Sequence, residues 1–143
     1  MTSSSTCSSS STLTSFALTS DGAAYYSPYW FATKPWEDPM GYWQRSPLSL
    51  VGNVKTPTLV VVGSEDYRTP DSEAEQFYEA LQLRGVPTMF VKVPGAAHET
   101  LTDRPSQSAA KASAILAWFD RYRTGTGTPP VATNEKASPQ QAR

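Results

Sequence analysis

The chain has 143 residues, enough for one domain with a modest core. Its 38% hydrophobic and 17% charged residues both lie below the averages of globular proteins, because both ends of the chain are polar. A net charge of -1, with no run of basic residues, gives no electrostatic reason to expect nucleic acid or an anionic membrane as a partner.

The two ends differ in composition from the middle of the chain. Residues 1–12 are almost all Ser and Thr, and residues 124–143 are rich in Thr, Gly, Pro, Gln and Ser. Neither end can bury enough apolar surface to offset the entropy of ordering it, so both are predicted to be disordered. The sequence therefore predicts one folded region over residues 13–123.

Targeting and redox features are few. The first basic residue is Lys34, so the N-terminus lacks the basic start of a signal peptide, and the longest strongly apolar run, residues 59–62, is too short to span a bilayer. One cysteine, Cys7, and one histidine, His98, allow neither an intrachain disulfide nor a Cys/His metal cluster. We expect no metal and no cofactor, and the compartment stays open, with the cytoplasm favoured.

Residues 13–50 are rich in aromatic side chains and contain three of the four tryptophans. Four prolines, at positions 28, 35, 39 and 47, divide this region, since each fixes φ and removes a backbone donor. We expect short turns and helical pieces that pack against a larger body.

A strand and a helix are predicted next. Residues 58–62 form a β-branched, continuously apolar run, which is typical of a parallel strand covered on both faces. A helix is predicted to start near Ser72, where Ser72 and Glu75 fit a capping box, and to stop at Gly85. The apolar face of this helix comprises Ala74, Phe77, Tyr78 and Leu81.

A second strand and a last helix complete the pattern. The strand is predicted over residues 88–93 and the helix over residues 106–123. The order strand, helix, strand, helix, with short connections, predicts an α/β fold with adjacent parallel strands and flanking helices. The expected buried face of the last helix comprises Ala109, Ala112, Ile115, Leu116 and Phe119.

Two residues that can do chemistry follow the two predicted strands. Asp66 lies in the loop after the first strand and His98 in the loop after the second, so we expect both at one edge of the sheet, where ligands bind. A carboxylate that accepts the imidazole Nδ1–H leaves Nε2 free to take a proton from a nucleophile. Asp66 and His98 are therefore candidates for the acid and base of a hydrolase triad, in the chain order of α/β-hydrolases.

Several blocks of residues occur in the order of a known family. They are Trp-Glu-Asp-Pro at 36–39, Arg-Ser-Pro-Leu at 45–48, Gly-Ser-Glu-Asp-Tyr-Arg-Thr-Pro at 63–70 and Val-Pro-Gly-Ala-Ala-His at 93–98. Together they resemble the prolyl oligopeptidase family of serine peptidases, and most closely its acylaminoacyl-peptidase and dipeptidyl-aminopeptidase-like branch. The similarity covers about residues 13–123.

The resemblance implies the C-terminal portion of an α/β-hydrolase fold, with Asp66 as triad acid and His98 as triad base, acting on a peptide or acyl-peptide substrate. One departure is clear, because the family's nucleophile motif, Gly-x-Ser-x-Gly, does not occur in the sequence. Ser64 follows Gly63, but no strand, elbow and helix surround it. We therefore expect a serine-type peptidase present as a C-terminal fragment that is inactive alone.

Two other functions stay open. One is a non-catalytic interaction module that docks its sheet edge and aromatic face onto a partner, either the N-terminal part of the catalytic domain or a second copy of the chain. The other is an esterase of the same fold, since a fold does not fix the substrate. Whichever function holds, we expect Arg68 to hold the Asp66 loop through a salt bridge rather than bind substrate, and Glu65 to be solvated.

Overall fold

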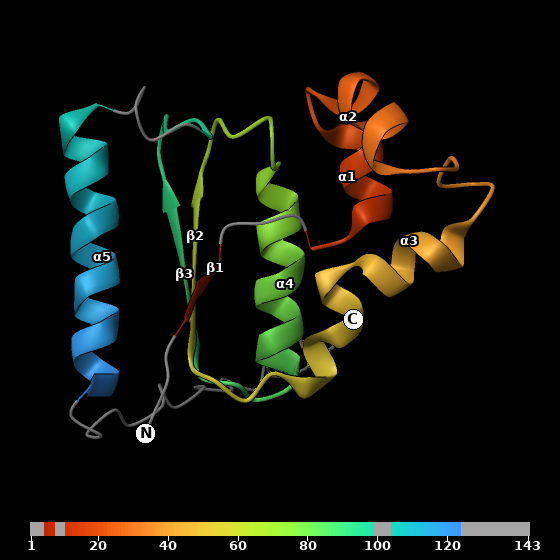
Figure 1. Cartoon of the computed structure of the whole chain (residues 1–143). Coiled ribbons are helices and arrows are strands. Elements are labelled where there is room, and N and C mark those ends of the chain that lie inside the picture. The colour runs from red at the N-terminus through yellow and green to blue at the C-terminus, as the bar shows by residue number, and fades with distance from the viewer. Residues whose placement is uncertain (1–4, 8–10, 99–103, 124–143) are drawn as a thin grey trace, which may run out of the picture.

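The fold is built around a small parallel sheet, seen in a computed structural model that describes residues 5–7, 11–98 and 104–123. The sheet has three strands in the spatial order β1 (Ser5–Cys7), β2 (Thr58–Gly63) and β3 (Thr88–Val93). Helix α4 (Asp71–Leu83) lies on one side of it and helix α5 (Pro105–Arg123) on the other (Figure 1). The predicted α/β architecture, with parallel strands and flanking helices, is confirmed.

The central strand β2 explains why its sequence is apolar throughout. Val60 and Val62 point to one face, where they pack with Ala74 of α4. Leu59 and Val61 point to the other face, where they share a cluster with two aromatic residues of α5. Because successive side chains of a strand alternate between faces, a strand covered by helices on both sides needs an apolar residue at every position.

Part of the N-terminal range that is predicted to be disordered is described by the structure. β1 pairs in parallel with β2, with Ser5 opposite Thr58 and Cys7 opposite Val60. Ser11 is buried. Strand pairing uses backbone groups, so a Ser/Thr-rich composition does not exclude it. The tail at residues 124–143, also predicted to be disordered, lies outside the described residues.

The start of α4 differs from the sequence prediction. The N-cap position is Pro70, and no side chain caps the helix, so the capping box of Ser72 and Glu75 is wrong. Glu75 instead pairs with Lys92 of β3, with 3.3 Å between Nζ and Oε1. A cation on the adjacent strand offers a carboxylate a charge-assisted bond, which the backbone at position 72 cannot match.

Residues 11–53 form a separate helical layer, which lies beyond α4 in Figure 1. As predicted, it consists of short pieces: α1 (Leu13–Thr19), α2 (Ala23–Trp30), α3 (Pro39–Arg45) and the 3-10 helix η1 (Pro47–Asn53). Its core is Tyr42, which is fully buried, stacks on Phe31 with 4.4 Å between ring centroids, and donates its hydroxyl to the carbonyl of Thr33 at 2.8 Å. Such a buried phenol with a satisfied hydroxyl anchors the layer, and Phe16 and Ala17 of α1 are buried with it.

The last helix buries a face that shares only Ile115 with the one predicted. Trp118 and Tyr122 face the sheet, with Ile115 beside them, whereas Leu116 and Phe119 are 65% and 38% exposed. Two apolar stripes therefore run along α5. The stripe that contains Trp118 and Tyr122 packs on β2 and β3, because these two large aromatic side chains bury the most apolar surface.

A buried carboxylate ties the helical layer to the α/β core. Glu73, in the first turn of α4, is 1% exposed. Its Oε2 accepts from the backbone N–H of Thr12 at 2.8 Å and from the Ser11 hydroxyl at 3.2 Å, and its Oε1 accepts from the Ser15 hydroxyl. These groups lie at the entry to α1, so one side chain fixes where the helical layer begins.

Replacement of Glu73 by Ala should lower the free energy of unfolding by about 2–4 kcal/mol, because two hydroxyls and one backbone N–H lose a buried acceptor. Glu73→Gln should cost less, since one carbonyl oxygen remains. Urea denaturation followed by circular dichroism measures both. Glu79→Ala, on the exposed side of the same helix, is the control and should change stability by less than about 0.5 kcal/mol. Equal losses for positions 73 and 79 would contradict this role.

Candidate active site

The two loops that carry the candidate residues leave the sheet at the same level. β2 and β3 are paired in parallel, with Gly63 opposite Val93 as the last pair of the ladder. The backbone then joins the loops directly, as Ser64 N–H donates to the Val93 carbonyl and Glu65 N–H donates to the Ala96 carbonyl, each at 3.0 Å. The loop after β2 is thus bonded along its first turn to the loop after β3.

Two further features bring these loops together. The Ser64 hydroxyl oxygen accepts from the Gly95 N–H at 2.8 Å, so this serine has a structural contact. Gly63 lies so close to the other loop that a Cβ at this position would be 2.1 Å from the Ala96 carbonyl oxygen. The absence of a side chain at Gly63 is what permits the close approach.

Asp66 occupies the inner side of its loop. Its side chain is only 4% exposed, and both carboxylate oxygens accept hydrogen bonds from Thr69. The Thr69 backbone N–H reaches Oδ1 at 2.8 Å, and the Thr69 hydroxyl reaches Oδ2 at 2.9 Å. Both donors belong to the residue three positions further along the chain, so they close a local turn that fixes the orientation of the carboxylate.

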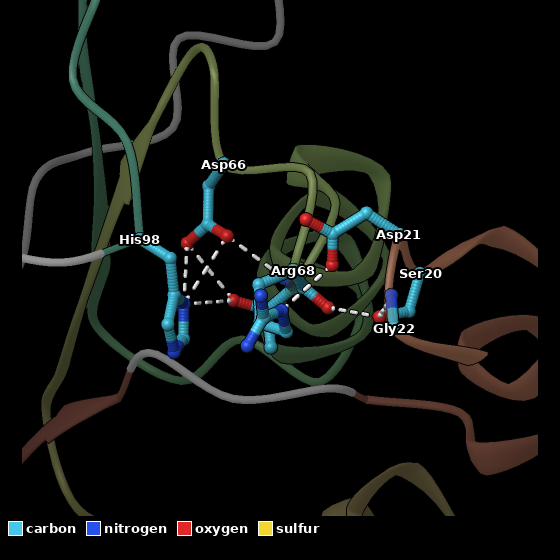
Figure 2. A network of polar contacts seen from close by, with 7 residues as sticks. Ser20, Asp21, Gly22, Asp66, Arg68 and His98 are labelled. Atoms are coloured by element: carbon cyan, nitrogen blue, oxygen red, sulfur yellow. Dashed lines mark hydrogen bonds and ion pairs between the residues drawn. The ribbon is translucent and has the colours of Figure 1, made fainter. Parts of the chain in front are cut away.

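His98 meets this carboxylate from the second loop. Its Nδ1 lies 3.0 Å from Oδ2 and 3.2 Å from Oδ1 of Asp66, and these contacts converge on one ring nitrogen in Figure 2. An ionised carboxylate only accepts hydrogen bonds, so it selects the tautomer with the proton on Nδ1. The His98 side chain is 42% exposed, and the other ring nitrogen, Nε2, is the acceptor that remains. The structure therefore brings together the two residues that the sequence predicts as a pair.

A second set of contacts holds the Asp66 loop from the side of the helical layer (Figure 2). Arg68 Nε lies 2.7 Å from Asp21 Oδ1, and the Ser20 hydroxyl donates to the Arg68 carbonyl at 2.7 Å. The Asp21 N–H donates to the Tyr67 carbonyl at 2.8 Å. The hydrogen bond that Arg68 Nε donates to the Asp21 carboxylate raises the pKa of Arg68. The prediction that Arg68 holds this loop through a salt bridge is confirmed.

Sequence reasoning missed three residues of this site. The contact of Thr69 with Asp66 could have been predicted, because an Asp followed three residues later by Thr is typical of a side-chain-stabilised turn. Ser20 and Asp21 gave no such signal, since they lie 48 and 47 residues from Arg68 in the chain. Their contact depends on where α1 and α2 pack.

Other kinds of site find no support in the described residues. Among residues 5–7, 11–98 and 104–123, no three His, Cys, Asp or Glu side chains gather where they could hold a metal ion. None of the helices in the same ranges is both long and apolar enough to cross a membrane.

The fold is that of an α/β-hydrolase, and solved structures of peptidases superpose on the chain. Acylaminoacyl peptidase of Pyrococcus horikoshii superposes with a TM-score of 0.72 at 25% identity, over 78% of this chain and 18% of that enzyme. An acylaminoacyl peptidase bound to Z-Gly-Gly-Phe-chloromethyl ketone gives a TM-score of 0.72 at 27% identity, over 82% of this chain and 19% of that one.

Sequence comparison then defines the family. The model of the prolyl oligopeptidase family, Peptidase_S9, matches residues 7–126, and the chain belongs to this family. The uncharacterized peptidase YuxL of Bacillus subtilis is 35% identical over 109 residues, which are 76% of this chain and 17% of that protein. The acylamino-acid-releasing enzyme of Arabidopsis thaliana is 36% identical over 86 residues, or 60% and 11% of the two chains. The chain thus spans less than a fifth of the length of these relatives.

Replacement of Gly63 by Ala should force the two loops apart, because the new Cβ would lie 2.1 Å from the Ala96 carbonyl oxygen. We expect a loss of about 2–4 kcal/mol in the free energy of unfolding, typical of overpacking at a backbone contact. Guanidinium denaturation measures it. At Gly52 the nearest atom to a new Cβ is 3.9 Å away, so Gly52→Ala is the matched control and should be almost neutral. A neutral Gly63→Ala would show that the loops do not need this contact.

Proposed function

We propose that the chain supplies the acid and the base of a serine peptidase active site, with Asp66 orienting His98. The observation that carries this proposal is the 3.0 Å contact between His98 Nδ1 and the buried Asp66 carboxylate, which leaves Nε2 on a partly exposed ring. A neutral imidazole in this tautomer can take a proton at Nε2, and the carboxylate stabilises the imidazolium that results. Membership of a peptidase family supports removal of a proton from a serine hydroxyl as the use of this pair.

In the proposed reaction a serine Oγ attacks the carbonyl carbon of a peptide or acyl-peptide, and its proton passes to His98 Nε2. The tetrahedral intermediate collapses as the C–N bond breaks, and His98 returns the proton to the leaving amine. Water then attacks the acyl-enzyme, with His98 again as base and then as acid. Two relatives are named as an acylamino-acid-releasing enzyme and an acylaminoacyl peptidase, and these names favour a peptide or acyl-peptide substrate over an ester.

The serine in this proposal comes from polypeptide that the 143 residues do not contain, because no Gly-x-Ser-x-Gly motif occurs among them. We therefore expect the purified chain to be inactive alone, since removal of the nucleophile leaves little of a triad's rate. A fluorophosphonate probe tests this, because it reacts with activated serines. We expect no covalent labelling of the chain, and a labelled serine found by mass spectrometry would contradict the proposal.

A chimera tests the acid–base roles directly. Residues 11–123 would replace the aligned segment of the Pyrococcus horikoshii enzyme, which keeps its own nucleophile. Hydrolysis of an N-acetylated amino-acid anilide should fall about 10⁴-fold in Asp66→Asn and about 10⁶-fold in His98→Ala, mostly in kcat. Assay of the matching ester in parallel distinguishes a peptidase from an esterase.

The matched control for the chimera is Glu65→Gln, which changes an exposed acid one residue from Asp66 and should leave kcat within about twofold. A chimera that folds, and whose serine reacts with the fluorophosphonate, but whose hydrolysis is equally fast with and without His98, would contradict the proposed function.

A second candidate is an interaction module, which the exposed aromatic face favours. Tyr25, Tyr29 and Trp36 are 71%, 77% and 69% exposed on and after α2, and Trp30 is 60% exposed. Within the described residues, β1 and β3 each have one strand neighbour, so each presents an open edge. Because the chain covers only 18% of the Pyrococcus horikoshii enzyme, the occupant that we propose is the preceding part of a catalytic domain of this family.

The docking proposal expects the isolated chain to self-associate through this face, and the double variant Tyr29→Lys, Trp36→Lys to shift it toward monomer without loss of helix content. Size-exclusion chromatography with light scattering measures both. A wild-type chain that is a clean monomer with one cooperative unfolding transition would count against docking.

A further inference from the structure

The hydroxyl of Thr69 contacts both members of the candidate pair. Its Oγ1 lies 2.9 Å from Asp66 Oδ2 and 3.1 Å from His98 Nδ1, so the three groups form a closed triangle. The backbone N–H of the same residue binds the other carboxylate oxygen at 2.8 Å. Thr69 is thus the residue that touches each oxygen of Asp66 and the ring nitrogen that faces them.

The number of protons available decides the direction of these bonds. The Asp66 carboxylate accepts only, so the single hydroxyl proton of Thr69 goes to Oδ2. The lone pairs of Oγ1 then face His98 Nδ1, which must donate a proton if the contact is to be favourable. Both the carboxylate and the hydroxyl oxygen therefore favour the tautomer with its proton on Nδ1, the form that leaves Nε2 as base.

Thr69 is held in place by its neighbours on both sides. The carbonyl of Arg68 accepts from Ser20, and the Arg68 side chain pairs with Asp21, so the residue before Thr69 is fixed to the helical layer. The residue after it, Pro70, is the N-cap of α4. With its backbone fixed at both ends, the hydroxyl of Thr69 meets Asp66 and His98 at little further entropic cost.

We propose that Thr69 is a positioning residue, whose hydroxyl locks the carboxylate rotamer of Asp66 and the Nδ1–H tautomer of His98. This proposal rests on the proposed function, because it states what prepares His98 as the base. Thr69 itself exchanges no proton with substrate in this account. Its role is to keep the pair in one arrangement before substrate arrives.

Nuclear magnetic resonance of the imidazole nitrogens tests the proposal, and His98 is the single histidine of the chain. With ¹⁵N-labelled histidine, the ring shifts give the ratio of the Nδ1–H to the Nε2–H tautomer in the neutral form. The wild-type chain should be mainly Nδ1–H. In Thr69→Val, which keeps the shape and loses the hydroxyl, this ratio should fall about fivefold, the size expected for the loss of one hydrogen bond.

Controls separate positioning from stability. Thr69→Ser keeps the hydroxyl and should restore the wild-type ratio, and Thr19→Val, which removes an exposed hydroxyl bonded to the carbonyl of Ser15, should leave it unchanged. An unchanged ratio in a folded Thr69→Val chain would overturn the proposal. A wild-type chain that is mainly Nε2–H would also overturn it.

Two measurements keep the result decisive. If the Thr69→Val chain does not fold, the tautomer ratio is measured in Thr69→Ala. If neither variant folds, the proposal is tested on the wild-type chain, through the hydroxyl proton of Thr69. A slowly exchanging Thr69 hydroxyl proton with a nuclear Overhauser effect to the Nδ1 proton of His98 supports the proposal, and a freely exchanging hydroxyl overturns it. Failure of the proposed function is read separately, from hydrolysis by the chimera, and it leaves the tautomer ratio as it is.

Discussion

The candidate site depends on the parallel register of β2 and β3. Because Gly63 pairs with Val93 at the end of the ladder, the loops to Asp66 and His98 start side by side. Loop backbone bonds at 3.0 Å and the bare Cα of Gly63 then bring them together. A one-residue slip of either strand would move one loop relative to the other and turn its side chains to the opposite face. The geometry of acid and base is therefore a consequence of sheet packing, with the loops adding the last hydrogen bonds.

The aromatic helical layer does more than cover the sheet. Through Ser20 and Asp21 it holds the backbone and side chain of Arg68, and through Glu73 it is itself fixed to α4. The loop of Asp66 is thus held on one side by the strand that precedes it and on the other by residues of the helical layer that lie about 50 positions earlier in the chain. This arrangement allows a buried carboxylate to keep one orientation while the imidazole beside it stays accessible.

Sequence reasoning reached the features that depend on local pattern. Residues 58–62 could be assigned as a buried strand because each of their faces needs apolar side chains, and Asp66 could be paired with His98 because parallel strands end at one edge. It failed where tertiary contacts choose between local options. Glu75, the acid of the expected capping box, pairs with Lys92 instead. In α5, Trp118 and Tyr122 pack on the sheet in place of Leu116 and Phe119. Strand β1 forms through backbone pairing, which amino-acid composition does not indicate.

The contact of His98 with Asp66 forms within the chain itself, before any substrate is present. The proton on His98 Nδ1 tests it most directly, since the ring is the only imidazole in the chain. We predict one imidazole N–H signal in the proton spectrum, shifted downfield of the amide region by its bond to a carboxylate, present in the wild-type chain and in Glu65→Gln but lost in Asp66→Asn. No such signal in the wild type, or one that persists in Asp66→Asn, would contradict the account.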